Sequence, residues 1–222
     1  MFGNGYGLNV IAAQTSFADG VQFFKNKEYV KAKSVFEYTL KQSDDPAETY
    51  YYIGLIALRF EKNFDAAIEN FEKAVEGNQN KSEYQFQLGN AYGSKARNSN
   101  FVSQMFLAPK VKNAFKKAVE LDPAFIEGRW GLMQYYLLAP GVAGGSVDKA
   151  KEQAEAILNL DRYQGCMAYV AVYEYEKKID KVEQYCQKAI SANPQKWEPY
   201  HRLGYVYISQ KRYDESIAQF SK

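Results

Sequence analysis

The sequence predicts an all-α protein built from stacked pairs of antiparallel helices, and three observations lead to this fold class. The first is internal repetition: one spacing of small and aromatic residues recurs in KAKSVFEYTL, AAIENFEKAV, VKNAFKKAVELDP, KVEQYCQKAISANP and ESIAQF. The second is an apolar periodicity of three and four residues, as amphipathic helices require. The third is composition: 46% of the 222 residues are apolar, with 19 Tyr and 14 Phe, which supplies a core and excludes disorder.

Each of these segments has an upstream partner, so every repeat contains two helices. The upstream segments place a glycine a few residues before a large apolar residue, as in DGVQFF, YIGLIAL, QLGNAYG and RLGYVYI. The glycine lets the two helices approach closely, and the large aromatic residue fills the space between one repeat and the next. Because no single pair can bury its apolar face alone, the pairs must stack.

About six repeats account for the chain from residue 13 onward. We expect a single domain over residues 13–222, preceded by an N-terminal tail over residues 1–12. The repeats are expected at 13–46, 47–80, 81–123, 124–160, 161–194 and 195–222. The last repeat stops inside its second helix, whereas such arrays normally end in a polar cap. We therefore expect mobility of the last helical turn or self-association through the uncapped C-terminal end.

The repeat pattern resembles that of the tetratricopeptide repeat family, over nearly the whole chain from residue 13. The residues that match the family signature are Leu88-Gly89 with Tyr92, Leu203-Gly204 with Tyr207, Ala67 with Phe71 and Ala74, Ala32 with Phe36, and Pro123 and Pro194. In the fourth and fifth repeats the substitutes are Met133, Tyr136, Ala154, Val170 and Cys186. The resemblance implies a right-handed α-solenoid.

The resemblance also implies that the first helix of each pair lines a concave groove. The groove residues implied are Phe17, Val21, Tyr51, Leu55, Phe86, Asn90, Trp130, Gln134, Met167, Ala171, His201 and Tyr205. This stripe is largely aromatic and apolar, and it lacks the Lys and Arg with which one subgroup of the family grips a C-terminal carboxylate. We expect a groove for an apolar peptide or an amphipathic helix. The alternative is that the chain's own N-terminal segment or a second copy fills it.

Two repeats are longer than the family's unit of about 34 residues. The third carries about ten extra residues and the fourth about five, near 93–110 and 138–147, and we expect both to lie at the turn between the first and second helix of the pair. We expect the two insertions to be neighbours on one elaborated edge of the array, with candidate residues Lys95, Arg97, Lys110, Gly144, Gly145 and Ser146. The three basic residues would suit an acidic segment of a partner, or they are simply solvated.

The second insertion contains the glycine-rich stretch LLAPGVAGGSVDKA, which could wrap a phosphate or form a long turn. A phosphate-binding P-loop needs a lysine directly after its last glycine and a strand before it, and this stretch has neither. We expect Ser146 to cap the next helix and Asp148 to lie in its first turn. Anion binding at that helix N-terminus is the alternative.

Composition leaves little room for catalysis, metal binding or nucleic-acid binding. His201 is the only histidine, so a multi-histidine metal site is impossible. Cys166 and Cys186 are too few for a structural zinc site, and we expect buried free thiols, with a disulfide between them as the alternative. The formal net charge of +2 is far from the basic excess of nucleic-acid-binding proteins. We expect no cofactor, no metal and no enzymatic activity.

The expected function is a protein-interaction scaffold that binds a protein or peptide partner. The alternative is a small-ligand-binding or enzymatic repeat protein with its site on the insertion loops. No apolar run approaches the roughly 18 residues of a membrane span. The N-terminal stretch MFGNGYGLNVIAA lacks the positive start of a secretory signal. We expect a soluble protein, and both a cytoplasmic and an exported location stay open.

Overall fold

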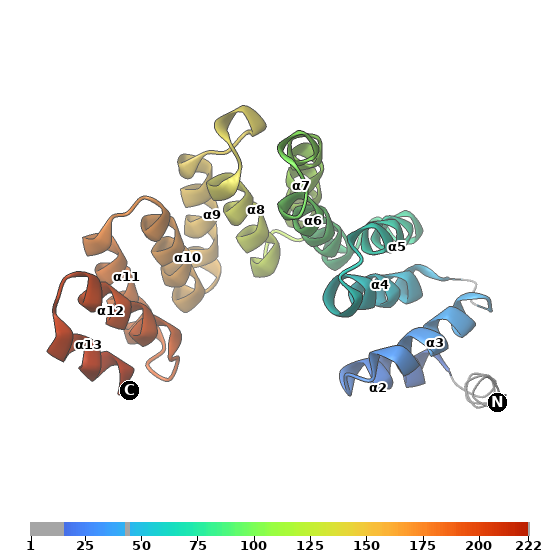
Figure 1. The fold of residues 1–222 in the computed structure, drawn as a ribbon, viewed down its shortest axis with the longest axis horizontal. Coiled ribbons are helices and arrows are strands. Elements are labelled where there is room, and N and C mark those ends of the chain that lie inside the picture. The colour runs from blue at the N-terminus through green and yellow to red at the C-terminus, as the bar shows by residue number, and fades with distance from the viewer. Residues whose placement is uncertain (1–15, 43–44, 222) are drawn as a thin grey trace. The chain divides into compact units, whose positions relative to one another are not determined.

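The computed structural model describes residues 16–42 and 45–221, and the tail expected over residues 1–12 lies outside these ranges. Within them the chain has no strand, and its α-helices form six consecutive pairs (Figure 1). The pairs are α2 (Phe17–Lys25) with α3 (Tyr29–Leu40), α4 (Ala47–Ile56) with α5 (Phe64–Gly77), α6 (Ser82–Arg97) with α7 (Phe101–Leu121), α8 (Ile126–Leu138) with α9 (Val147–Leu160), α10 (Arg162–Tyr175) with α11 (Ile179–Ala192), and α12 (Glu198–Ser209) with α13 (Tyr213–Phe220). The prediction of an all-α fold of helix pairs is confirmed.

The chain divides into two compact units between Asp122 and Pro123. The first unit contains α2 to α7 and the second contains α8 to α13. Each unit has buried apolar clusters of its own, one of them around Phe36 in the first unit and another around Met133 in the second. The prediction of one domain over residues 13–222 stays a prediction.

A glycine on the first helix faces a phenylalanine ring on the second helix in each pair of the first unit. A Cβ added to Gly20 would lie 2.7 Å from the Phe36 ring, and a Cβ added to Gly54 would lie 2.7 Å from the Phe71 ring. Both rings are fully buried. The third pair repeats the contact through Gly89. The family signature therefore marks the point where the two helices touch. The sequence predicted the close approach at the glycine, but it placed the aromatic residue between repeats and not against the glycine of its own pair.

The fourth pair exchanges the large and the small residue of this contact, and the fifth pair uses two medium-sized residues. Met133 replaces the glycine and Ala154 replaces the phenylalanine, and both lie in one fully buried cluster. Val170 and Cys186 share a second buried cluster in the fifth pair. Because close packing constrains the summed volume more than its position, the two pairs retain the fold without the signature residues.

The spacing between signature residues shows how each pair accommodates its length. Sixteen positions separate Gly20 from Phe36, and seventeen separate Gly54 from Phe71. The single extra residue of the second pair is absorbed by a π-helical turn, Ala57–Glu61, which continues α4. The connection to α5 needs no additional loop residue, so the contact between Gly54 and Phe71 stays in register.

The ten extra residues of the third pair lengthen its helices and leave the turn short, so the expectation that they lie at the turn is wrong for this pair. Helix α7 begins fourteen residues before Phe115, whereas α5 begins seven residues before Phe71. Helix α6 likewise runs eight residues past Gly89, and the connecting turn occupies only residues 98–100. Seven added residues are two helical turns, or about 10 Å. The third pair is therefore an elongated helical hairpin.

Four turns inside the pairs contain a lysine in the left-handed backbone conformation, which the sequence analysis did not anticipate. These lysines have φ angles between 55° and 62° and are Lys27, Lys62, Lys177 and Lys211. In three of the turns the next residue donates its backbone N–H to the carbonyl five residues earlier, for example Arg212 to Tyr207 at 2.8 Å. Glycine usually occupies this helix-ending position, so its absence hid these helix ends.

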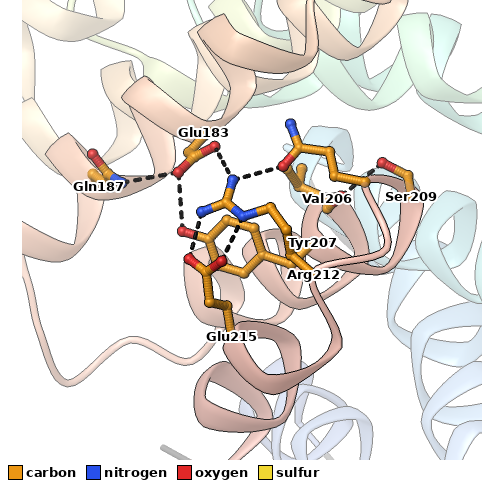
Figure 2. A network of polar contacts seen from close by, with 8 residues as sticks. Glu183, Gln187, Val206, Tyr207, Ser209, Arg212 and Glu215 are labelled. Atoms are coloured by element: carbon orange, nitrogen blue, oxygen red, sulfur yellow. Dashed lines mark hydrogen bonds and ion pairs between the residues drawn. The ribbon is translucent and has the colours of Figure 1, made fainter.

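A polar network holds the last pair against the helix before it (Figure 2). The Arg212 guanidinium lies 4.1 Å from the Tyr207 ring centre, and its Nη1 donates to Glu183 Oε2 at 3.1 Å. The Tyr207 hydroxyl donates to the other oxygen of the same carboxylate. Arg212 also pairs with Glu215, which lowers the pKa of that carboxyl. The network fixes α12 relative to α11 in the second unit.

Candidate functional site

The groove candidates lie on the first helix of every pair, as the resemblance implied. Three of them are exposed: Gln134, His201 and Tyr205. Leu55 is only 4% exposed and lies in the core. The remaining candidates are half-buried: Phe17, Val21, Tyr51, Phe86, Asn90, Trp130, Met167 and Ala171.

On α2, α4, α6 and α12 the first candidate packs against the phenylalanine of its own pair. In the first unit this ring contact has a centroid distance of 5.6 Å for Phe17 on Phe36, and 6.1 Å for Tyr51 on Phe71. In the second unit His201 lies 5.7 Å from Phe220. Each of these rings therefore packs one side against the phenylalanine of its own pair.

The first unit has a tyrosine cluster beside Tyr51. The Tyr51 and Tyr84 rings are stacked with centroids 4.9 Å apart, and Tyr52 packs edge-on to Tyr51 at 5.6 Å. Burial raises the pKa of Tyr51, and raises that of Tyr84 to about 12. Both phenols are therefore neutral at physiological pH. In the same unit Asn90 donates to the Gln87 side-chain oxygen at 3.3 Å.

In the second unit, four rings on α12, on α13 and in the turn before α12 form an exposed aromatic cluster. The His201 ring lies 5.4 Å from Trp197 and 4.9 Å from Tyr205, and Phe220 lies 5.6 Å from Tyr205. Trp197 is 63% exposed and Tyr205 58%. Sequence reasoning missed Trp197, although its spacing of four residues from His201 and eight from Tyr205 would have placed all three on one face.

The other candidates on first helices of the second unit are more structural. Trp130 and Ala171 pack against the buried cluster around Met133. Met167 packs against the cluster around Val170. Gln134 projects outward from α8. The most accessible part of the predicted stripe is therefore the face of α12.

The basic residues of the first insertion all have contacts within their own unit. Lys95 pairs with Asp65 on α5, and Arg97 donates to the Ser94 hydroxyl at 3.1 Å. The Lys110 ammonium lies 5.2 Å from the Tyr92 ring centre. Since the two insertions belong to different compact units, their expected position as neighbours stays a prediction.

The glycine-rich stretch is a turn followed by a helix cap, as expected. Gly144 has a φ of 90°, and a Cβ on Gly145 would lie 1.8 Å from the Ala139 carbonyl oxygen, so both positions require glycine. The Ser146 hydroxyl accepts the Lys149 backbone N–H at 3.3 Å and caps α9. The Lys149 backbone N–H at the start of α9 thus has its hydrogen-bond partner in the Ser146 side chain.

Both cysteines are buried free thiols. Burial raises the pKa of Cys166, and it raises that of Cys186 to about 12, so both are protonated and unreactive at neutral pH. In the part of the chain that the structure describes, no three His, Cys, Asp or Glu side chains gather in a way that could hold a metal ion. None of the described helices is long and apolar enough to span a membrane.

Two stretches of the chain match models of the tetratricopeptide repeat. The first covers residues 47–81, which is the second repeat expected from the sequence. The other covers residues 185–218 and runs from α11 into α13. No curated protein matches the chain.

Solved structures of tetratricopeptide repeat proteins share the fold. A protein of the thermophile Thermus thermophilus matches with a TM-score of 0.65 at 19% identity, over 91% of this chain and 97% of its own. A protein of Parabacteroides merdae matches with a TM-score of 0.68 at 13% identity, over 92% and 76%. YrrB, described as having an unusual peptide-binding site, matches with 0.56 at 18% identity, over 82% and 87%. The matched repeats, the helix pairs and their glycine–phenylalanine contacts together make this chain a tetratricopeptide repeat protein.

Proposed function

We propose that the chain binds an apolar peptide or an amphipathic helix of a protein partner on the exposed faces of its first helices. Tetratricopeptide repeats generally serve as protein-interaction scaffolds and are generally not enzymes. The observation that carries the proposal is the aromatic cluster at Trp197, His201 and Tyr205. Large aromatic side chains that remain more than half exposed are frequent energetic centres of interfaces.

The polar groups beside this surface favour an apolar ligand over a carboxylate. Arg202 is the basic residue on α12, and its Nη1 lies 2.9 Å from both oxygens of Glu174. A peptide carboxylate would have to displace Glu174 to reach this guanidinium. In the first unit the Asn90 side-chain amide already donates a hydrogen bond to the Gln87 side-chain oxygen. The apolar faces are therefore more available than the charged groups.

Replacing Trp197 or Tyr205 with Ala is expected to weaken binding roughly tenfold or more, because interface aromatics commonly contribute this much. A peptide selected from a displayed library on the wild-type chain provides the ligand, and fluorescence anisotropy gives Kd. Both side chains are exposed, so the variants should keep the wild-type circular dichroism spectrum and Tm.

Tyr213→Ala is the matched control, since Tyr213 is 59% exposed but lies on a second helix, α13. This variant should bind like the wild type. Equal losses at Tyr213 and Tyr205, or no loss at Tyr205 and Trp197, would refute the proposed surface. If a second copy of the chain is the occupant, light scattering will show a dimer that the Tyr205 variant dissociates.

A further inference from the structure

The elongated hairpin of α6 and α7 differs in charge from the rest of the chain. Between Glu83 and Glu120 there are 36 residues without a single Asp or Glu. The same segment holds six basic residues: Lys95, Arg97, Lys110, Lys112, Lys116 and Lys117. This leaves 22 basic and 26 acidic residues elsewhere, a formal net charge of −4 outside the segment. The net positive charge of the protein thus comes from this one hairpin, since the rest of the chain is net negative.

The tip of this hairpin exposes large apolar side chains. Phe101 is 66% exposed, Val102 63% and Phe106 76%, and all three lie in the first two turns of α7. Helical spacing places Met105 on the same outward face. The buried residues of α7 begin only at Val111. The two turns added by the insertion therefore carry an apolar surface that the hairpin's own core does not use.

The lysines of α7 follow the apolar residues along the same outward face. At 100° per residue, Lys112 and Lys116 fall between the directions of Phe101 and Phe106, with Lys110 at the edge of the face. Lys116 pairs with Glu120 at 3.4 Å. About 13 Å of helix axis separates Phe101 from Lys110. The face changes along the helix from apolar at the tip to basic behind it.

The polar side chains of the hairpin turn make hydrogen bonds within the hairpin. The Asn98 amide donates to the Ser94 carbonyl at 2.8 Å, and the Ser99 hydroxyl donates to the Lys95 carbonyl at 2.7 Å. The Asn100 side chain accepts a backbone N–H of α7 at 3.0 Å. Because these groups have partners inside the hairpin, moving the tip into an apolar environment costs less than it would for free amides and hydroxyls.

We propose that the α6–α7 hairpin (green in Figure 1) docks on an anionic lipid membrane, with its apolar tip in the interface and its lysines among the headgroups. An interfacial helix buries its apolar residues about 5–10 Å deep, and basic residues near the surface attract anionic lipids. The tip residues match that depth, and the lysines behind them match the headgroup level. An acidic protein segment would satisfy the lysines but leave the apolar tip in water.

The test is co-sedimentation of the full chain with lipid vesicles. The chain is expected to sediment with phosphatidylcholine vesicles that contain phosphatidylserine, and to bind several-fold less to phosphatidylcholine alone, since the attraction of surface lysines requires anionic lipid. Added salt should lower binding to the anionic vesicles because it screens the lysines. Failure to bind the anionic vesicles above the background of neutral ones would overturn the proposal.

Two sets of variants test separately how the apolar tip and the lysines contribute to vesicle binding. The double change Phe101→Ser and Phe106→Ser should reduce vesicle binding roughly tenfold or more, because two exposed rings lose their transfer from water. Val30→Ser on α3 is the matched control, since Val30 is 65% exposed in the same unit, and it should bind like the wild type. Lys112→Gln with Lys116→Gln should reduce binding and weaken its salt dependence.

The circular dichroism spectrum verifies that each variant is folded. Unchanged vesicle binding by the phenylalanine variant contradicts insertion of the tip. Capture of poly-glutamate by the wild-type chain without vesicle binding assigns the hairpin to an acidic protein segment and also overturns the proposal. The Tyr205 variant should bind vesicles normally, so this test does not depend on the peptide-binding proposal.

Discussion

Replacing Phe71 with Ala is expected to lower the free energy of unfolding by about 3–5 kcal/mol. The ring is fully buried between the two helices of its pair, against Gly54 and Tyr51. Its removal loses apolar burial and leaves a cavity that two rigid helices close only in part. Urea denaturation followed by circular dichroism measures the loss.

Phe106→Ala provides the control for this prediction, since the same residue type on the second helix of the next pair is 76% exposed. It should change the free energy of unfolding by no more than about 0.5 kcal/mol. If the two variants cost the same, the glycine–phenylalanine contact is not what holds a pair together.

Gly165→Ala is expected to cost about 3 kcal/mol or more, which is the upper end of the range for overpacking. A Cβ at this position would lie 2.1 Å from the Leu158 Cα, so the clash is with the backbone of α9. At Gly54 the clash is with a ring that can rotate slightly, whereas here a whole helix must move. The melting temperature and the urea midpoint both report the loss.

Gly93 is the comparison, because it also lies inside a helix and a Cβ there meets nothing closer than 3.8 Å. Gly93→Ala should stabilise the protein by about 0.5–1 kcal/mol through helix propensity alone. A Gly165 variant as stable as the wild type would mean that α9 and α10 do not approach as closely as described.

The helix pairs and their contact residues were predictable because the signature spacing encodes them. The places of Met133 and Ala154 followed from position in the repeat even though neither residue fits the pattern. Packing explains this success, since a large residue facing a small one fills the same space whichever helix carries it.

The length of the third pair was not predictable in the same way. Pro109 lies inside α7, where proline normally interrupts a helix, so the local sequence does not indicate one continuous helix through this position. Asn100 caps α7 by accepting the Ser103 backbone N–H, and it was the signal for the earlier helix start. The αL lysines were missed for a related reason: position 62 and its equivalents lack the glycine that usually marks a helix end.

The candidate groove was predictable as a set of positions but not as a set of exposed side chains. Leu55 is buried, and one side of the Tyr51 ring packs against Phe71. Spacing gives the direction of a side chain on its helix, but not how much a neighbouring side chain covers it. Trp197 lies just before α12, outside the signature, and was missed for that reason.

A photo-reactive phenylalanine analogue tests most directly whether the first helices carry the binding surface. The analogue replaces Tyr205 on α12 in one protein and Tyr213 on α13 in another, two positions with nearly equal exposure. Each protein is irradiated with the peptide selected on the wild-type chain, and the cross-links are mapped by mass spectrometry. We predict that the peptide cross-links from position 205 and not from position 213. Cross-linking from 213 alone, or equally from both, would contradict a surface on the first helices.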